Sequence, residues 1–507
     1  MNTELKKQLD EFRSKTLAFS KGELSIKDYK GFSGKYGSYA QRGANASMLR
    51  LRMSGGEISK DHLKSIIDIC EKYGLNHLHC TTCQTIQLHD IPFDKVTDVM
   101  TDAINYGFYT LGGGGDFPRN VMVSPLSGVE KGEYFDVMPY AKSAAEYLIS
   151  QIDKVKMPRK LKVAFSNSPA NSTHATFRDL GFVAREDGNF DVYCAGGMGL
   201  NPKMGVKVDE KIESKNILYY IKAMISLFCE YGNYENRAKA RTRYMQDTLG
   251  YKLTEEYHKH LKKVFDEGGL EINVNSEDIT KKGVVCELSS RRIIPQKQDG
   301  LYTVKFHPIG GNLHPETVKR IYETIKDMDS VLLRVSPDET IYILNCSGNE
   351  VQSVLDATSD GGEKDIEQSV SCIGASICQQ GLRDSQALLK TILDAVKPYD
   401  FPADALPLIH ISGCMSSCGT HQIGSIGFHG KVKMVDKKPV AGFTISINGS
   451  DNQGKEHFGD DIGVIAADDI PKFMIELGKA VTAENMSFAE YSAKKQDAFL
   501  DLINKYI

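Results

Sequence analysis

Four of the eleven cysteines form two spaced pairs in segments rich in glycine and serine. Cys372 and Cys378 are separated by five residues, Cys414 and Cys418 by three, and 35 residues lie between the pairs. Four thiolates from two loops can hold an iron–sulfur cubane, and small neighbours would let backbone N–H groups approach the sulfurs. Structural zinc sites usually have spacings of two to four residues. The pattern therefore favours a [4Fe-4S] cluster over zinc and over four unrelated buried cysteines.

The remaining composition indicates a reducing compartment and a small-molecule function. Eleven cysteines in 507 residues are too dilute for a disulfide scaffold. The N-terminus has no apolar signal region, and no stretch approaches 18 consecutive apolar residues, so we predict a cytoplasmic protein without a membrane partner. A net charge of -4 and a pI near 6.4 argue against a nucleic-acid partner.

The cysteine pattern C-x5-C followed by G-C-x3-C resembles the siroheme sulfite and nitrite reductases, most closely the assimilatory, ferredoxin-type sulfite reductase hemoprotein. The resemblance runs from about residue 45 to 435 and implies two cofactors, siroheme and a [4Fe-4S] cluster. It also implies that Cys418 ligates the siroheme iron as well as the cluster. It is carried by motifs in family order: MLRLRMSGG (48–56), QLHD (87–90), PRNV (118–121), PRKLK (158–162), DLGFVA (179–184) and NRAKARTRYMQDTLG (236–250).

Several basic residues have the chemistry that such a site needs. Siroheme carries eight carboxylates and sulfite is an anion, so clustered cations must neutralise charge and relay protons. The resemblance assigns substrate binding to Arg50, Arg119, Lys160 and Lys162. Lys160 and Lys162, on either side of Leu161, are predicted to share one face of a strand. A solvated strand-edge charge is the alternative for any one of the four cations. Lys162 favours sulfite, because the nitrite enzymes often have Asn at this position.

A second group of residues is implied to contact siroheme. Its members are Arg52, Cys83, Gln87, His89, Asn120, Arg237, Arg241 and Arg243. For the last three arginines a solvated helix face is the alternative, and His89 could simply be a strand histidine.

Three positions depart from the family pattern. Ile373 and Met415-Ser416 replace the usual Pro and Pro-Asn, which changes loop rigidity but leaves every ligand in place. Cys83 replaces an Arg that helps to anchor siroheme carboxylates. The anchor has been lost or moved to another cation, or Cys83 is a reactive thiol, or it pairs with Cys80. Strand parity argues against the pairing, and we favour the loss of one anchor.

The chain contains an internal duplication. Residues 48–89 match residues 303–344 without gaps at an offset of 255, and residues 164–182 match 410–428 at an offset of 246. In the first block we predict a strand at 49–53, a helix from N-cap Ser59 to Gly74, and one returning strand at 78–88. In the second block only the later copy has cysteines, because Ser168 and Ser172 stand opposite Cys414 and Cys418.

The predicted fold class is mixed α+β, internally duplicated with pseudo-two-fold symmetry. It comprises two ferredoxin-like half-domains and two siroheme- and Fe-S-binding α/β modules. The expected domains are an N-terminal arm (1–45), a first half-domain (46–115), a first α/β domain without a cluster (116–285), a second half-domain (286–355) and the cluster-binding α/β domain (356–507).

The expected function is the six-electron reduction of sulfite to sulfide at siroheme bridged to the cluster. No G-x-G-x-x-G follows a predicted strand, and no second cluster motif is present, so electrons must come from outside. We expect ferredoxin rather than a separate flavoprotein. The alternatives are nitrite reduction to ammonia with the same cofactors and, because of Cys83, a non-catalytic Fe-S carrier or scaffold that has lost siroheme.

Overall fold

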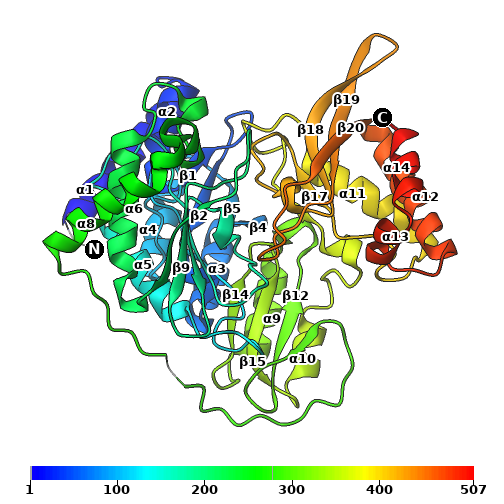
Figure 1. The fold of residues 1–507 in the computed structure, drawn as a ribbon, viewed down its shortest axis with the longest axis horizontal. Coiled ribbons are helices and arrows are strands. Elements are labelled where there is room, and N and C mark those ends of the chain that lie inside the picture. Colours follow the sequence, from blue (N-terminus) through cyan, green and yellow to red (C-terminus); the bar gives the residue numbers. More distant parts are fainter. Residues whose placement is uncertain (1–2, 277) are drawn as a thin grey trace.

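The computed structural model of the chain describes residues 3–276 and 278–507. Twenty strands in this part of the chain form four five-stranded sheets. Two of the sheets belong to ferredoxin-like half-domains, and the other two belong to α/β domains that lie towards opposite ends of the molecule (Figure 1). No helix in the described residues is long and apolar enough to cross a membrane.

The two ferredoxin-like sheets exchange an edge strand. The first has the order β1(Ser38–Ala40), β2(Ser47–Leu51), β5(Ile86–Ile91), β4(Leu78–Cys80), β13(Asn312–Leu313). The second has the order β11(Ile293–Pro295), β12(Leu301–Phe306), β15(Ile341–Ser347), β14(Leu332–Val335), β3(Glu57–Ile58). Strands β3 and β13 are equivalent at the offset of 255, and each completes the sheet of the other copy.

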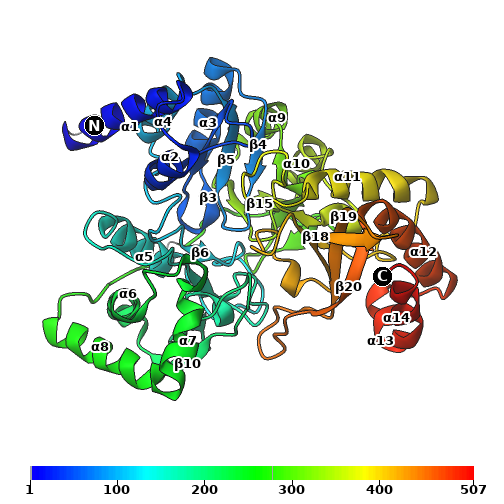
Figure 2. The ribbon, with the colours of Figure 1, turned by 90° about the horizontal axis from the view of Figure 1, so that it is seen from above.

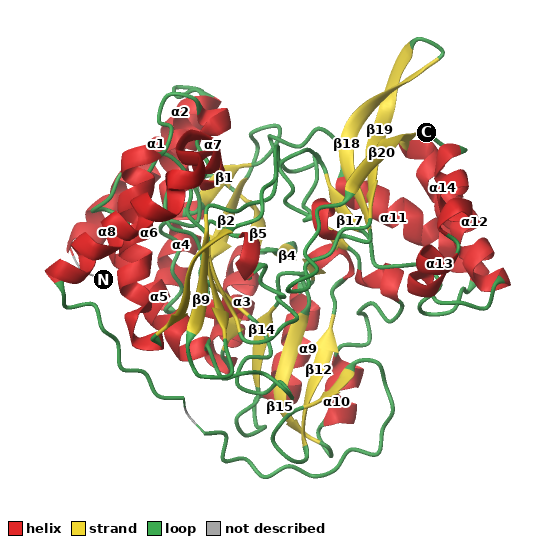
Figure 3. Ribbon diagram, in the orientation of Figure 1, coloured by secondary structure: helices red, strands yellow, loops and turns green. Residues whose placement is uncertain are grey.

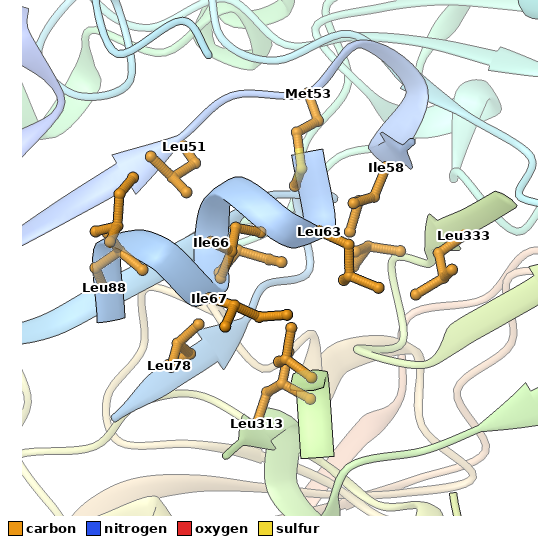
Figure 4. Close-up of a cluster of buried hydrophobic side chains, with 14 of the residues drawn as sticks. Leu51, Met53, Ile58, Leu63, Ile66, Ile67, Leu78, Leu88, Leu313 and Leu333 are labelled. Atoms are coloured by element: carbon orange, nitrogen blue, oxygen red, sulfur yellow. The ribbon is translucent and has the colours of Figure 1, made fainter. Parts of the chain in front are cut away.

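One hydrophobic core serves both half-domains. It is covered by the helices α3(Lys60–Tyr73), α4(Val96–Asn105), α9(Pro315–Ile325) and α10(Val351–Ala357). Figure 4 shows Ile66 and Ile67 of α3 pointing towards Leu78 and Leu313, which come from different copies. Ser59 caps α3 as predicted, because its side chain accepts a hydrogen bond from the His62 N–H.

The two α/β domains repeat one sheet topology. The first sheet contains β6(Met122–Val123), β7(Val163–Ser166), β8(Leu180–Ala184), β9(Phe190–Cys194) and β10(Val206–Ile212). The second contains β16(Val370–Ser371), β17(His410–Ser412), β18(Ile426–Val435), β19(Lys438–Ile447) and β20(Asp460–Ala466). In both, the first three strands are parallel and the last two antiparallel. The internal duplication and the mixed α+β fold are therefore confirmed.

Helices cover these sheets at the two ends of the molecule (Figure 2). Those of the first domain are α5(Met138–Ser150), α6(Ile217–Tyr231), α7(Met245–Leu249) and α8(Leu253–Glu267). Those of the second are α11(Ser385–Val396), α12(Ile470–Ala483), α13(Phe488–Lys494) and α14(Gln496–Asn504). The hairpin of β18 and β19 projects well beyond the body of the second domain (Figure 3).

Two further regions complete the chain, an N-terminal helical segment and a connection between the halves. The N-terminal helices α1(Thr3–Ser20) and α2(Ile26–Ser33) precede β1, which lies within the predicted arm but pairs with β2. Between α8 and β11, the described residues from 268 to 292 form no helix or strand and run along the lower edge of the molecule in Figure 1. The predicted domain boundaries stay a prediction.

Two local predictions were wrong. Residues 78–88 are not one strand, because a turn over 81–85 separates the antiparallel strands β4 and β5. Lys160 and Lys162 do not lie within a strand, since β7 begins at Val163, and only Leu161 forms an isolated bridge, with Pro118.

Candidate functional site

A cavity of about 450 Å³ lies where the four sheets meet. Its wall comes from β2, the β4–β5 turn, the loops around 113–120 and 159–162, and the loops that follow β16 and β17. Every predicted site residue except Arg243 lines it. These are Arg50, Arg52, Cys83, Gln87, His89, Arg119, Asn120, Lys160, Lys162, Arg237, Arg241, Cys372, Cys378, Cys414 and Cys418.

The four cysteines come from equivalent loop positions in one domain. Cys372 follows β16, Cys414 follows β17, and Cys378 and Cys418 lie further along the same two loops. Burial raises the pKa of the Cys418 thiol, Lys160 opposes this shift, and Cys378 and Cys414 add to it. Among the described residues, no three Cys, His, Asp or Glu side chains are arranged to hold a single metal ion.

Backbone groups support these sulfurs. The Gly413 N–H donates to Cys372 Sγ over 3.2 Å, and Ser385 Oγ lies 3.1 Å from the same sulfur. Such donors stabilise thiolate ligands and tune a cluster's potential. Gly419, beside Cys418, has to be glycine because a Cβ there would lie 2.0 Å from the Ile411 carbonyl oxygen. Thr82 Oγ1 donates to the Cys418 carbonyl over 2.8 Å, which ties the β4–β5 turn to the cluster loop.

Backbone carbonyls orient the two arginines proposed for substrate binding. Arg50 Nη1 and Arg119 Nη1 both donate to the carbonyl of Gly113, the latter over 2.6 Å. Arg119 Nη2 also donates to the Gly115 carbonyl over 2.9 Å. Burial lowers the pKa of Arg119 to about 10, which still leaves it protonated at neutral pH. Backbone carbonyls therefore hold both guanidinium groups in place.

The two lysines are more easily deprotonated. Burial, then the neighbouring Lys162, Arg241 and Arg119, lowers the pKa of Lys160 well below its ordinary value. Burial also lowers the pKa of Lys162, although Cys83 opposes this shift. Amines with lowered pKa values can give up protons more readily. The pair thus suits proton delivery to an oxyanion under reduction.

The cavity is strongly electropositive. Among the described residues that line it, the single carboxyl group is that of Glu339, whose pKa burial raises well above the ordinary range, which favours its neutral form. Seven of the ten lining cations have no ion pair with any described acidic residue: Lys30, Arg50, Arg52, Arg119, Lys160, Lys162 and Arg178. Burying unpaired cations is costly unless an anion accompanies them. The donor set therefore fits a polycarboxylate cofactor with a small oxyanion beside it.

The other predicted contacts divide into three kinds. Gln87 and His89 lie on β5 and bond to each other over 3.1 Å, and burial holds the pKa of His89 well below its usual range. Arg237 and Arg241 line the cavity while paired to Asp116 and Asp179. Arg243 instead donates to the backbone carbonyls of 200 and 201 outside the cavity. A contact between Arg243 and the cofactor is not supported by this position.

Cys83 and Cys80 lie in different surroundings. Cys80 is fully buried in the half-domain core, whereas Cys83 lies in the β4–β5 turn and lines the cavity. Burial raises the pKa of Cys83, but Lys162, Arg178, Lys160 and Arg50 outweigh it and lower the pKa to about 6. The separate surroundings argue against a CxxC pair, as the sequence prediction did, although the reason is the turn rather than strand parity.

Tyr39 and Arg178 are among the lining residues that the sequence prediction missed. Tyr39 accepts a hydrogen bond from the Gly115 N–H over 2.6 Å and lies close to Arg119. Arg178 immediately precedes the DLGFVA motif, but nothing in its spacing distinguishes it from a surface cation. Both face the cavity only because distant loops fold against them.

Comparison with known proteins gives two family matches along the chain. The nitrite/sulfite reductase ferredoxin-like half domain matches residues 39–105 and 294–359, which are the two strand-exchanged copies. The nitrite and sulphite reductase 4Fe-4S domain matches residues 114–265. Together they cover more than half of the chain. This protein belongs to the nitrite/sulfite reductase family. The family's cofactors, siroheme and a [4Fe-4S] cluster, are therefore those of this chain.

Individual members of the family are distant. Over 79% of its length, this chain is 25% identical to the chloroplastic ferredoxin--nitrite reductase of Arabidopsis thaliana, and the match covers 70% of that protein. Over the same share of its length it is 23% identical to the sulfite reductase [ferredoxin] 1 of Mycolicibacterium paratuberculosis, of which the match covers 73%. The solved structure of the Mycobacterium tuberculosis NirA protein has the same fold, with a TM-score of 0.77 and 22% identity over 97% of this chain and 95% of that one.

The matched 4Fe-4S domain and the four cysteines lie in different parts of this chain. The match to the 4Fe-4S domain covers the first α/β copy, whereas the four cysteines lie in the second, which repeats its topology. When bound, siroheme and the cluster would supply one-electron transfers to the substrate. The chain brings four cysteines and a set of cations to the one cavity that would hold them.

Proposed function

We propose that this reductase converts sulfite to sulfide with six electrons from a ferredoxin-type donor. The observation that carries the proposal is that Arg50, Arg119, Lys160 and Lys162 face one cavity together with the four cysteines. The two arginines bind and orient the oxyanion, for which a planar guanidinium is well suited. The two lysines, whose pKa values burial lowers, pass protons to its oxygens as electrons arrive.

The residues that hold the cofactors are part of the same proposal. Cys372, Cys378, Cys414 and Cys418 ligate the cluster, and Cys418 also binds the siroheme iron, as the family resemblance implies; Lys160 and Lys162 both act on its thiol. A ferredoxin donor is supported by the similarity to ferredoxin-dependent sulfite and nitrite reductases.

Nitrite reduction to ammonia is the second candidate. It is supported by the similarity to the chloroplastic nitrite reductase of Arabidopsis thaliana, which at 25% identity is no more distant from this chain than the sulfite reductase of Mycolicibacterium paratuberculosis at 23%. Nitrite carries one negative charge and sulfite up to two, so a cavity with many unpaired cations favours sulfite.

Steady-state turnover of the purified holoenzyme with reduced methyl viologen would test this choice. Sulfide and ammonia should be quantified separately, so that each product is tied to its substrate. We expect a higher kcat/KM for sulfite than for nitrite. The reverse order would contradict the sulfite assignment, and turnover with viologen but not with any reduced ferredoxin would contradict the proposed donor.

A further inference from the structure

Arg178 is a buried cation on the wall of the cavity. It lies just before β8 and is 4% exposed, yet it lines the cavity next to Cys83 and Lys162. No described carboxylate forms an ion pair with it. Cys83, Asp179 and Asp451 act on it only without a direct ion pair, so its cavity side has room for a ligand anion at hydrogen-bond distance.

A relay of hydrogen bonds fixes one edge of this guanidinium. Arg178 Nε donates to the Thr173 carbonyl over 2.9 Å, and Nη2 lies 2.7 Å from His174 Nδ1. A guanidinium can only donate, so His174 Nδ1 accepts and His174 Nε2 carries the proton. Nε2 faces Asp451 Oδ2 at 3.2 Å. Burial, then Arg178, lowers the pKa of His174 to about 4, so the imidazole stays neutral at physiological pH.

The relay crosses between the two α/β domains. Asp451 belongs to the second domain, and Asn171 of the first donates to its carbonyl over 2.8 Å. Arg178 is thus held from behind by both domains, while its Nη1 makes no hydrogen bond to any described residue. In the second copy the equivalent position is Gly424, so this cation exists in one copy only.

The surroundings favour a carboxylate at Nη1. Cys83 beside it is small and leaves space, and although the surrounding cations lower the pKa of its thiol to about 6, Lys162 and Lys160 add positive potential from the same wall. A carboxylate in a poorly hydrated, cationic pocket forms strong charge-assisted hydrogen bonds.

We propose that Arg178, with Cys83 leaving it room, forms a binding subsite for one peripheral carboxylate of the tetrapyrrole, and that His174 and Asp451 position it. The subsite rests on the siroheme cofactor of the family and not on whether sulfite or nitrite is the substrate. A failure of the substrate assignment therefore leaves the subsite standing.

The test is the siroheme content of an Arg178→Gln variant produced under limiting siroheme. Extracted siroheme is measured per chain, and non-heme iron and acid-labile sulfide are measured separately. We expect siroheme occupancy to fall about tenfold, as the loss of a charged hydrogen bond predicts, with cluster iron retained. Arg185→Gln is the matched control, since Arg185 pairs with Asp191 away from the cavity.

A rescue variant makes the test specific. Adding Cys83→Arg to Arg178→Gln returns a guanidinium to the same pocket and should restore siroheme occupancy. Full occupancy in folded Arg178→Gln protein would overturn the proposal, and if only the KM for sulfite rose, the subsite would serve the substrate instead. Should Arg178→Gln not fold, Asp451→Asn should speed siroheme release on mild heating, and an unchanged rate would equally overturn the proposal.

Discussion

Unpaired cations around one cavity explain much of this protein's chemistry at the scale of single residues. Arg52 is 3% exposed and has no acidic partner among the described residues, so burial, then Arg119 and Arg50, lowers its pKa to about 9. A protein retains such groups where they serve a ligand, because they cost stability otherwise. The same argument separates Arg241, which forms an ion pair with Asp179, from Arg178, which forms no ion pair with a described carboxylate.

Cys418 is the residue on which the coupling of the two cofactors depends. In a Cys418→Ser variant the hydroxyl is a poor ligand for iron, so we expect the bridge to be lost. Sulfite reduction should fall below detection, and the magnetic coupling between siroheme and cluster should disappear from the Mössbauer spectrum. Full six-electron activity in this variant would contradict the proposed bridge.

Lys162 is expected to set the preference for sulfite. Lys162→Asn removes a cation that faces the cavity but keeps a hydrogen-bond donor, so a dianion should lose more binding than a monoanion. We expect kcat/KM for sulfite to fall about tenfold more than that for nitrite, measured with reduced viologen. Lys154→Asn is the matched control because Lys154 is exposed and outside the cavity. An equal loss for both anions would count against this role.

Glu339 should make stability depend on pH. Its folded pKa is raised by burial above the unfolded value, so its contribution is fully present below the unfolded pKa and is lost as pH rises through the folded pKa. Glu339→Gln cannot ionise, so the variant does not lose this stability as the pH rises. The variant should therefore gain stability over the parent by up to about 1.4 kcal/mol for each pH unit in that window.

Thermal melts between pH 4.5 and 8 would measure this difference. Glu146→Gln, on the exposed face of α5, serves as the control and should not diverge from the parent with pH. If the Tm difference between Glu339→Gln and the parent stays constant over this range, Glu339 does not titrate in the way proposed.

At the scale of elements, the exchange of β3 and β13 is the feature that joins the two copies. Each is a two-residue strand that follows a pair of glycines, and each pairs antiparallel with the other copy's sheet. Arg334 of β14 forms a 3.1 Å ion pair with Glu57 of β3. Neither half-domain sheet is complete without the other, so the pair should fold as one cooperative unit.

Gly56 is required for this exchange. Its φ is +71°, and a Cβ would lie 2.4 Å from the Val335 carbonyl oxygen of β14. Gly74→Ala is the matched control, since Gly74 has a φ of +66° but open space around it. We expect Gly74→Ala to cost about 1 kcal/mol and Gly56→Ala about 2 kcal/mol more, measured by denaturant unfolding. An equal loss of unfolding free energy in the two variants would mean that the structure relieves the contact between the new Cβ and the Val335 carbonyl at no cost.

At the scale of the molecule, three domains meet at Gln84 in the β4–β5 turn. Its fully buried side chain bonds to the backbone of Val123 in the first α/β domain and donates to the Val335 carbonyl in the second half-domain over 2.7 Å. Arg42, near the N-terminus, donates to the carbonyls of Cys378 and Gly381 in the cluster loop. The cavity therefore depends on contacts between segments more than 300 residues apart.

Cutting the chain between the halves should leave the molecule intact. Cleavage at a protease site inserted after Asn275, in the connection between α8 and β11, would break the covalent link between the halves. Both exchanged strands would stay paired. We expect the two fragments to co-elute in size-exclusion chromatography and to retain siroheme and activity. Separation of the fragments under native conditions would show that the exchange does not hold the halves together.

The sequence alone was sufficient for whatever depends on short or repeated patterns. The spacing of Cys372, Cys378, Cys414 and Cys418 predicted the cluster, and the constant offsets predicted the duplicated fold, because a repeat must form the same local structure twice. Ser59 was recognisable as a helix cap, since capping involves neighbours only.

The tertiary structure decided which strand completes which sheet and which cations lack a counter-ion. The β4–β5 turn was missed because parity alone does not distinguish one strand from two that pair antiparallel. In the sequence, Arg178 is indistinguishable from a surface cation, and Arg243 is equivalent to Arg241. The packing of distant loops places Arg178 and Arg241 beside the cavity and Arg243 outside it. Such outcomes depend on long-range packing and on desolvation, and neither is encoded in the spacing of residues along a chain.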